Sequence, residues 1–523
     1  MKTRLLYPDR DFEWSAAAPW NGAALTVDLA LTTLFDTMAQ GDACVFDAAR
    51  KVLLSGVRGD LETIRYRQEI IRDCLDHPEV LRAIYSLVVE AKEKDKGHYL
   101  GSLKRYPHWV LRDAIEQMEM FAGMFGKLRK LIDLHEKKFA SRGLTNLCAM
   151  LQREFDDAYL ARIGMHLQQL RFPGAMVLSA ALDRGNKASN YVLHRVPDCG
   201  ETWWQSQWRM LKEALFPPKS SAPGFTLHPR DEGGVRALEI LRDQGISNVA
   251  AALAQSRDHI RNFFSELRQE LAFYVGCVNL CERLTQKGEP VCLPEPMTSG
   301  DADFSFRGLY DACLALNLGQ RVVGNDANAD GRTLIIVTGA NQGGKSTFLR
   351  SVGLAQLMMQ CGMFVPAQSF RSAICTGLFT HYRREEDASM KSGRFDEELG
   401  RMSEIVECIS PDAMVLLNEP FAATNEREGS EIGRQVMTAL SDKSIRVICV
   451  THLFELAHGL YKQHLGNALF LRAERQADGV RTFKLMEGEP LPTSHGPDLY
   501  DSIFGTDTRE WRDDDSRSAA RTA

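Results

Sequence analysis

The stretch Leu334-Ile-Ile-Val-Thr338 is followed directly by Gly339-Ala-Asn-Gln-Gly-Gly-Lys-Ser346. The first five residues form an apolar, largely β-branched run, which is typical of a strand buried on both faces. The next eight match the pattern G-x-x-x-x-G-K-[ST] of a phosphate-binding loop. Residues 347–360 then carry apolar side chains at helical spacing. Strand, glycine-rich loop and helix therefore follow in the order that this motif requires.

The residue types of the loop suit the binding of a nucleotide phosphate. Gly339, Gly343 and Gly344 can adopt backbone angles that are closed to other residues. The loop N–H groups can then turn toward a β-phosphate at a helix N-terminus, which favours anions. Lys345 would supply a point charge to the β- and γ-phosphates, and Ser346 a hydroxyl ligand for Mg²⁺. The predicted ATP-contacting residues of this loop are Gly339, Ala340, Asn341, Gln342, Gly343, Gly344, Lys345, Ser346 and Thr347.

Strand and helix patterns alternate after this loop. Helices are predicted at about 389–409 and 428–440, and further strands at 378–383, 413–417 and 445–450. This alternation predicts a parallel sheet with crossover helices, whose ligand-binding edge lies at the carboxyl ends of the strands. Glu419 and His452 would meet the loop there. A carboxylate just past a buried strand is placed for a general base, whereas a lone histidine there is often only a packing residue.

The region before the loop is mainly helical in pattern, as in a helix bundle. Apolar residues recur at helical steps in 61–88, 110–134 and 235–284, and the last of these predicts a long helix, in which Gly245 is a candidate break. Within 172–230 the spacing of apolar residues changes from a helical to a strand-like pattern, which predicts a small β insertion. Its expected strands are residues 176–182, 191–196 and 225–227.

Prolines at 290, 294 and 296 mark a domain boundary near residue 288. We therefore expect a helical domain over 1–287, a nucleotide domain over 288–505 and a disordered tail over 506–523, because the tail is charged and rich in small residues.

The composition excludes some functions and leaves others open. A chain of 523 residues with 44% hydrophobic content suggests two to four domains, and a net charge of −6 gives no global nucleic-acid footprint. We see no signal-type apolar segment and no run long enough to span a bilayer, which favours a soluble, cytoplasmic protein without a membrane partner. The twelve cysteines are scattered, which predicts reduced thiols and no metal centre.

Any polyanion binding would need a local patch, and residues 92–109 are one candidate. This stretch is rich in lysines and aromatic residues and ends in His108-Trp109, a combination that could contact nucleic acid. Glu93 and Asp95 interleave with the lysines, which favours an ordinary solvated helix end. A second basic cluster at 127–138 has the same two interpretations.

Several segments together resemble the MutS family of mismatch-repair ATPases. Residues 338–347 are similar to its phosphate-binding loop, with Asn two residues after the first Gly and a double Gly before Lys. Phe364-Val-Pro-Ala367 and Thr451-His-Leu-Phe-Glu-Leu456 also follow the family, and Ser392-Gly393-Arg394 lies where the family carries a short signature segment. The upstream helices are similar to the family's lever domain in pattern only, and the β insertion would take the place of its clamp.

The resemblance implies an ABC-type α/β P-loop NTPase domain with a mostly parallel sheet, preceded by a mainly α-helical lever/core domain with a small β insertion. It also implies a homodimer with composite ATP sites, in which Ser392 and Gly393 face the γ-phosphate bound by the partner subunit. Glu419 would polarise the attacking water and His452 would sense the γ-phosphate. The residues implied around Mg²⁺ are Ser346, Asn418 and Glu419.

Three features depart from the family pattern. Asn418 stands where the family has the Walker B Asp, and it lacks the charge that holds Mg²⁺ through its water shell, so hydrolysis could be slow. Val322 falls about where mismatch-repair members place an aromatic ring over the base, which leaves adenine selectivity open. We also expect no mismatch-reading domain ahead of the lever, because too few residues precede it. Phe264-Ser265-Glu266 mimics the family's mismatch motif but lies within a helical core pattern.

The leading hypothesis is a MutS-like ATPase without mismatch recognition. It would bind and hydrolyse ATP to drive dimer closure and lever movement on DNA, in repair or recombination. The alternative, favoured by Asn418, is a nucleotide-gated scaffold with weak or no hydrolysis that regulates a protein partner. A chromosome-organising or transport-type ABC ATPase is disfavoured by the double Gly and by residues 451–456.

Overall fold

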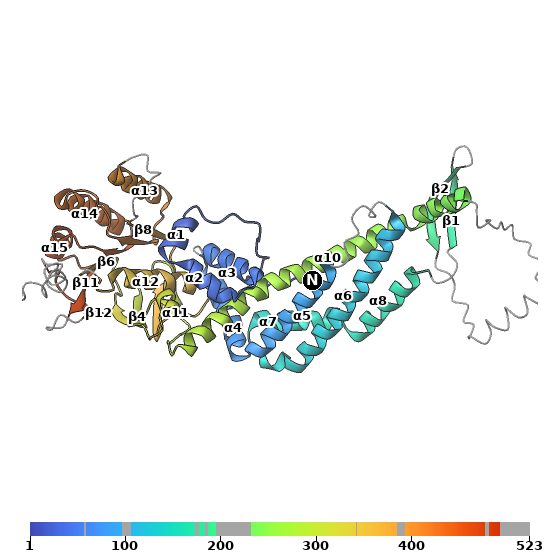
Figure 1. Cartoon of the computed structure of the whole chain (residues 1–523), viewed down its shortest axis with the longest axis horizontal. Coiled ribbons are helices and arrows are strands. Elements are labelled where there is room, and N and C mark those ends of the chain that lie inside the picture. The colour runs from blue at the N-terminus through green and yellow to red at the C-terminus, as the bar shows by residue number, and fades with distance from the viewer. Residues whose placement is uncertain are drawn as a thin grey trace, which may run out of the picture. The chain divides into compact units, whose positions relative to one another are not determined.

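A computed structural model describes residues 1–56, 59–96, 106–172, 177–183, 187–194, 232–340, 342–383, 393–475 and 481–491. Its elements fall into two compact units (Figure 1). The helical unit comprises Met1, 83–136 and 148–268. The mixed unit comprises 2–82, 137–147 and 269–523. The predicted division of the chain near residue 288 stays a prediction.

A six-stranded sheet forms the centre of the mixed unit, in the order β12-β11-β6-β10-β9-β8. Its strands are β6 (Leu334–Thr338), β8 (Leu378–Tyr382), β9 (Met414–Asn418), β10 (Arg446–Val450), β11 (Ala468–Arg475) and β12 (Arg481–Glu487). Neighbours from β11 to β8 pair in parallel, and β12 pairs with β11 antiparallel. The sheet is therefore mostly parallel, as the alternation of strands and helices predicted, with one antiparallel edge strand.

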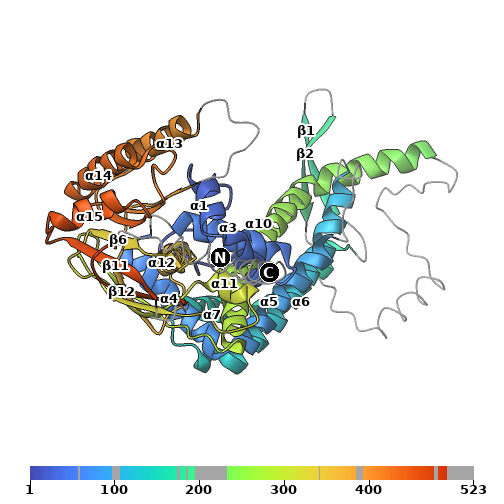
Figure 2. The same cartoon turned by 60° about the vertical axis from the view of Figure 1, so that its left-hand side comes forward.

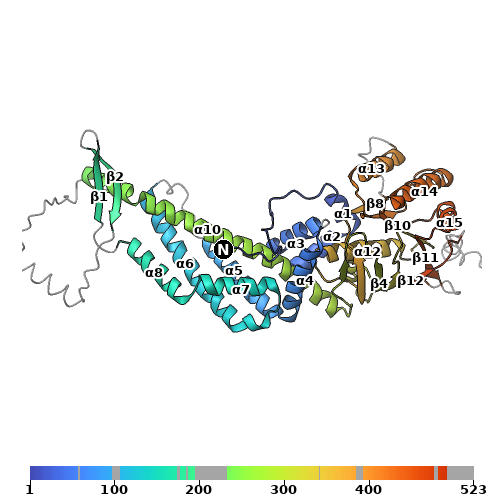
Figure 3. The ribbon, with the colours of Figure 1, turned by 180° about the vertical axis from the view of Figure 1, so that it is seen from behind.

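Helices cover both faces of this sheet, with α13, α14 and α15 on one face and α12 on the other (Figures 2 and 3). Their bounds are α12 (Lys345–Gln360), α13 (Arg394–Cys408), α14 (Glu426–Asp442) and α15 (Phe454–Lys462). All five residues of β6 are buried. Burial on both faces explains why the central strands read as continuous apolar runs without alternation.

A second, four-stranded sheet in the order β3-β7-β4-β5 adjoins the first in the mixed unit, and the sequence patterns did not predict it. Its strands are β3 (Glu295–Met297), β4 (Phe304–Leu309), β5 (Asn325–Asn328) and β7 (Ser369–Ala373). Phe304, Phe306 and Phe370 pack together within it. Its strand β4 leads into the short helix α11 (Ala312–Asn317), which Asp311 caps by accepting a hydrogen bond from Leu314 N at 3.0 Å.

The first helices of the chain belong to the mixed unit. They are α1 (Gly22–Asp28), α2 (Leu31–Ala39), α3 (Ala43–Ser55) and α4 (Leu61–Asp76). Asn21 Nδ2 donates a hydrogen bond to Leu378 O at 2.8 Å, which fixes the start of α1 against β8. The helical pattern over 61–88 divides at His77, because Pro78 begins the new helix α5 (Pro78–Lys96) and disfavours helical angles in the residue before it.

The helical unit is organised around a cluster of phenylalanine rings. Its elements include α6 (Pro107–His135), α8 (Asp157–Leu170) and parts of α5, η3 (Glu136–Lys138), α7 (Arg142–Glu154) and α10 (Glu232–Gln286). Phe264 is 1% exposed and its ring stacks on Phe121 with a centroid distance of 5.3 Å. The Phe264-Ser265-Glu266 triplet therefore begins with a core residue, as the helical pattern predicted.

The long helix predicted over 235–284 is confirmed as α10, whereas the candidate break at Gly245 is wrong, because the helix is continuous over 55 residues. A single glycine costs a helix only about 1 kcal/mol. Ile246 and Ala250, on the next turn, are buried in an apolar cluster that fixes this part of the helix.

The predicted β insertion is present as an antiparallel pair, β1 (Val177–Asp183) and β2 (Lys187–His194), which pairs Asp183 with Lys187. The second strand begins at Lys187, four residues earlier in the sequence than predicted. The predicted third strand at 225–227 and the predicted disordered tail at 506–523 lie outside the described residues.

All cysteines in the described part of the chain are free thiols, and that part holds no group of three or more His, Cys, Asp or Glu residues placed to bind a metal ion. Among the same residues, we find no helix with the length and apolar character needed to cross a bilayer.

Candidate nucleotide site

Functional side chains follow four neighbouring parallel strands, where each strand ends. The glycine-rich loop follows β6, His452 lies two residues after β10, Glu419 directly follows β9 and Arg383 directly follows β8. Because these strands are parallel neighbours, their carboxyl ends meet at the same edge of the sheet. The sheet thus brings together residues that are up to about a hundred positions apart in the sequence.

The loop has the backbone geometry that its glycines were predicted to provide. Gly339 and Gly344 have φ angles of +122° and +84°. A Cβ atom on Gly339 would also lie 2.8 Å from Cβ of Ala473, so a larger residue would be both strained and obstructed. Glycine is therefore needed at position 339 for the close approach to β11.

Lys345, in the first turn of α12, is 5% exposed. Its Nζ donates hydrogen bonds to Gly339 O and Ala340 O, both at 2.9 Å. Burial lowers the pKa of Lys345, and the nearby charge of Glu419 opposes this shift. The amine therefore lies inside the loop, where an anion would offset the cost of burying its charge.

Oxygen ligands suited to Mg²⁺ meet beside Lys345. Ser346 Oγ donates a hydrogen bond to Asn418 Oδ1 at 2.9 Å, and Ser346 and Glu419 line one cavity. A hydroxyl, an amide oxygen and a carboxylate are the hard ligands that Mg²⁺ prefers, usually together with waters and substrate phosphates. The residues predicted to surround the metal are thus adjacent and chemically suited to it.

Glu419 adopts an uncommon backbone conformation with a φ angle of +54°. Its N–H donates to Val450 O at 2.8 Å. Its carboxylate oxygens lie 3.6 Å from Nδ1 of His452 and 3.4 Å from Nη1 of Arg383. The interaction with His452 is the largest of the effects that lower the pKa of Glu419, Arg383 acts in the same direction, and burial opposes both. Glu419 is therefore ionised at neutral pH.

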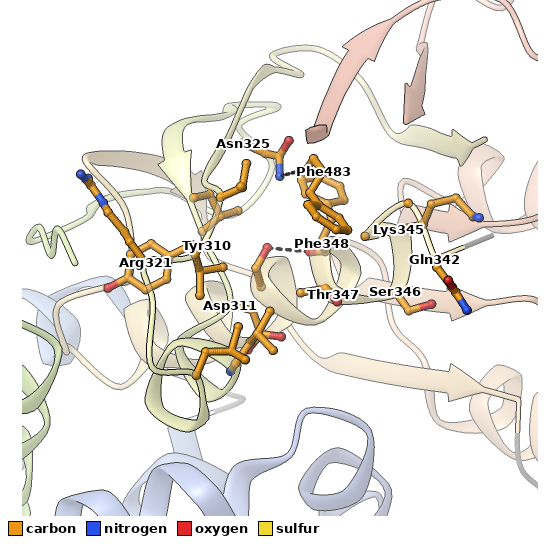
Figure 4. A pocket seen from close by; sticks show the side chains of 18 of the residues that line it. Tyr310, Asp311, Arg321, Asn325, Gln342, Lys345, Ser346, Thr347, Phe348 and Phe483 are labelled. Atoms are coloured by element: carbon orange, nitrogen blue, oxygen red, sulfur yellow. Dashed lines mark hydrogen bonds between the residues drawn. The ribbon is translucent and has the colours of Figure 1, made fainter. Parts of the chain in front are cut away.

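A cavity of about 390 Å³ begins at the loop. In Figure 4 its loop residues Gln342, Lys345 and Ser346 lie at one side of the view, and Tyr310 and Arg321 lie at the opposite side. The lining also includes Val322, Val323, Asn325, Phe348, Glu419 and Phe483. The cavity has a charged end at the loop and a more apolar end at the 309–323 segment, which suits the phosphates and the base of a nucleotide.

Sequence reasoning missed Phe483 and Arg383. Phe483 lies in β12 with a φ angle of +57°, and its carbonyl accepts a hydrogen bond from Asn325 Nδ2 at 3.3 Å (Figure 4). No local pattern marks it, because β12 follows the loop by more than a hundred residues. Arg383 could have been found by the rule that identified Glu419, since it is the last residue of a predicted strand.

The other predicted residues differ in their relation to the cavity. Gly343, Gly344 and Thr347 line it, whereas Gly339 and Ala340 shape the loop without lining it. Gly393 is the N-cap of α13 and does not line the cavity. Asn341 and Ser392 lie outside the described residues. The fold and the site together define an α/β protein with a phosphate-binding loop at the carboxyl edge of a mostly parallel sheet.

Comparisons with known proteins agree with the assignment of this chain to the α/β proteins that have a phosphate-binding loop. A family model described as the MutS2 N-terminal domain matches residues 59–287, and a model described as MutS domain V matches residues 335–499. The chain belongs to the MutS family. The resemblance seen in the motifs is confirmed, and MutS domain V is an α/β domain of the P-loop ATPase type. Neither model, by its description, is one for mismatch recognition.

Individual relatives are similar over part of their length. Endonuclease MutS2 of Lacticaseibacillus paracasei is 28% identical over 286 residues, which are 52% of this chain and 34% of that protein. Endonuclease MutS2 of Streptococcus thermophilus is 32% identical over 172 residues, covering 32% and 22% of the two chains. MutS protein homolog 4 of Mus musculus is 31% identical over 182 residues, covering 34% and 19%. The matches thus span about a third or less of these relatives.

Phe483→Ala is expected to raise the Kd for a fluorescent ATP analogue by about fivefold or more, since stacking on a base is worth about 1–3 kcal/mol. Equilibrium titration measures this change. Phe454→Ala on α15, outside the cavity lining, is the matched control and should leave the Kd unchanged. Equal affinity of the Phe483→Ala variant and the wild type would exclude Phe483 from the base site.

Proposed function

We propose that this chain is a MutS-family ATPase that binds ATP with Mg²⁺ in the cavity beside β6 and hydrolyses it. The observation that carries the proposal is the meeting of buried Lys345, the Ser346–Asn418 pair and the Glu419–His452 pair at one edge of the sheet. A phosphate-binding loop, an oxygen-rich metal site and an ionised carboxylate are the parts that phosphoryl transfer needs.

Each residue has a definite part in this mechanism. The loop N–H groups and Lys345 hold the β- and γ-phosphates, while Ser346 and Asn418 would hold Mg²⁺ directly or through its waters. The metal would neutralise charge that develops on the phosphate oxygens. The lowered pKa of Glu419 makes its carboxylate a weak proton acceptor. It therefore orients and polarises the attacking water, and His452 holds the carboxylate in place.

The cavity is connected to the end of helix α10 within the mixed unit. Lys287 Nζ donates to Leu318 O at 2.6 Å, and Glu289 Oε1 accepts from Val322 N at 2.7 Å. Leu318 and Val322 both line the cavity, and Glu289 is 4% exposed. A nucleotide that moves the 318–322 segment would therefore pull on the end of α10, which supports the proposal that ATP moves the helical lever.

The proposed partners are DNA and a second copy of the chain. Relatives named as endonucleases support action on DNA, in repair or recombination. In the proposed dimer, Ser392 and Gly393 complete the ATP site of the partner subunit. Steady-state ATP hydrolysis with duplex, single-stranded and branched DNA tests this function. Stimulation by one DNA form is expected, and tight ATP binding with DNA-indifferent, negligible turnover would refute it.

A nucleotide-gated scaffold that regulates a protein partner is the second candidate. Asn418 favours it, because the neutral amide beside Ser346 gives Mg²⁺ no charge at this position. Such a scaffold would bind ATP and close without turnover.

Asn418→Asp is expected to raise the turnover rate at limiting Mg²⁺ by about tenfold, because a second carboxylate beside Glu419 strengthens the metal site. Hydrolysis measured across a Mg²⁺ titration checks this. Asn418→Ala, which removes the oxygen that faces Ser346, should require more Mg²⁺ than the wild type. Identical Mg²⁺ curves for all three proteins would show that position 418 does not face the metal.

A further inference from the structure

The helical unit contains a hollow of about 330 Å³ that the nucleotide site does not use. It lies between the start of α6, the end of α8 and α10, and its lining includes His108, Trp109 and Phe172. Three arginines also line it. Arg112 lies in α6, Arg171 directly follows α8 and Arg242 lies in α10. None of the lining residues is acidic. The basic and aromatic stretch of the sequence thus ends in a hollow to which distant arginines also contribute.

The charges around this hollow are incompletely balanced. Arg112 Nε lies 3.1 Å from Glu116 and Arg171 Nη2 lies 2.7 Å from Glu119, both in pairs with substantial solvent exposure, whereas the contact of His108 Nδ1 with Asp243 at 2.9 Å is largely buried. Such exposed pairs contribute little, so a stronger anion can compete for the arginines. Among the described residues, Arg242 has no ion pair, which leaves its charge available to a ligand.

Trp109 adds a flat surface beside these charges. The Arg112 guanidinium lies 5.8 Å from the centre of the Trp109 ring, within the range of a cation–π contact. The hollow also lies at the N-terminus of α6, which begins at Pro107, and a helix N-terminus favours anions. Its volume lies at the lower end of the range for small-molecule sites, about 300–1,000 Å³.

We propose that this hollow binds one nucleotide unit of single-stranded DNA, with the base stacked on Trp109 and the adjoining phosphates held by Arg112, Arg171 and Arg242. A planar ring beside several arginines fits a ligand that is flat on one part and anionic on the next. A duplex keeps its bases stacked inside, so an unpaired strand fits better than a duplex. An acidic peptide would use the arginines but would gain nothing from the ring.

The proposal rests on the proposed action on DNA, and binding of the full-length protein to a fluorescein-labelled oligothymidylate tests it. Arg242→Glu is expected to raise the Kd about tenfold or more, because it reverses the available charge. Trp109→Ala should raise the Kd about fivefold or more, whereas Trp109→Phe, which keeps a ring, should lose much less. Arg236→Glu makes the same charge change on an exposed position of α10 outside the hollow, and should change the Kd less than twofold.

Two further measurements separate the possible outcomes. ATP-analogue affinity, which depends on the mixed unit, should be unchanged in all four variants and shows that this unit is intact, while retained DNA binding by Trp109→Phe and Arg236→Glu shows that the helical unit tolerates changes around the hollow. If the wild type binds ATP but no DNA, both the DNA partner and this inference fail. If the wild type binds DNA and the hollow variants bind it equally well, only the inference fails. Equal losses for single strand and duplex, or displacement by polyglutamate with no effect of Trp109→Ala, would overturn the assignment of a stacked base.

Discussion

Lys345→Ala is expected to reduce the affinity for an ATP analogue by about a hundredfold or more and to abolish nucleotide-dependent dimer closure. The amine of Lys345 is the positive group buried inside the loop, hydrogen-bonded to Gly339 O and Ala340 O. Without it, the β- and γ-phosphates would enter a partly desolvated site with no compensating charge at this position. Equilibrium titration gives the affinity, and small-angle scattering with and without the analogue gives the closure.

Two other variants make the Lys345 test specific. Lys345→Met keeps most of the side-chain volume but lacks the charge, so it should behave like Lys345→Ala if the charge is responsible. Lys462→Ala on the exposed end of α15 removes a lysine far from the loop in sequence and outside the cavity lining, and it should behave like the wild type. Scattering profiles that respond to the analogue in the same way in all proteins would refute the proposed role of Lys345.

Glu419→Gln is expected to keep ATP binding and to slow hydrolysis by about a hundredfold or more, the usual range for loss of a group that activates a nucleophile. The amide keeps the shape of the side chain but not the charge that polarises water. Single-turnover hydrolysis and equilibrium binding, measured on the same preparation, separate the two effects. Because the pKa of Glu419 is lowered, its ionisation should cause no loss of wild-type turnover above about pH 5.

The turnover rates of the wild type and Glu419→Gln also decide between a hydrolysing ATPase and a nucleotide-gated scaffold. A scaffold that does not use turnover would give equal, negligible rates for the wild type and Glu419→Gln. Glu428→Gln, an exposed change in the first turn of α14, is the matched control and should hydrolyse ATP at the wild-type rate. A hydrolysing wild type with an equally active Glu419→Gln variant would mean that another group polarises the water.

The candidate site was largely predictable because its signals are local. The loop from Gly339 to Ser346 is contiguous, and Glu419 directly follows a buried strand, so one rule about parallel strands was enough to place both at the same edge. The same rule placed His452 at this edge, whereas its role was proposed only from the resemblance, and the structure places its Nδ1 3.6 Å from the carboxylate of Glu419. Arg383 also directly follows a strand of this sheet and could have been predicted by the same rule, but it was overlooked.

Other parts of the fold could not be predicted from local patterns. Phe483 enters the cavity because β12 pairs with β11, which in turn pairs with the loop strand β6. Strand pairing between segments so distant in sequence leaves no periodicity that marks its residues. The continuity of α10 through Gly245 also depended on burial of Ile246 and Ala250, which outweighs the low helix propensity of glycine.

The sequence by itself determined the strand, loop and helix around Lys345, the mostly parallel sheet and the carboxylate at its edge. These features follow from backbone freedom, hydrophobic periodicity and strand direction, which act within a few residues. Only the tertiary structure decided which distant side chains join them. Phe483 at the nucleotide cavity and Arg242 beside Trp109 are brought into place by packing and strand pairing, whose contacts link positions far apart in the chain.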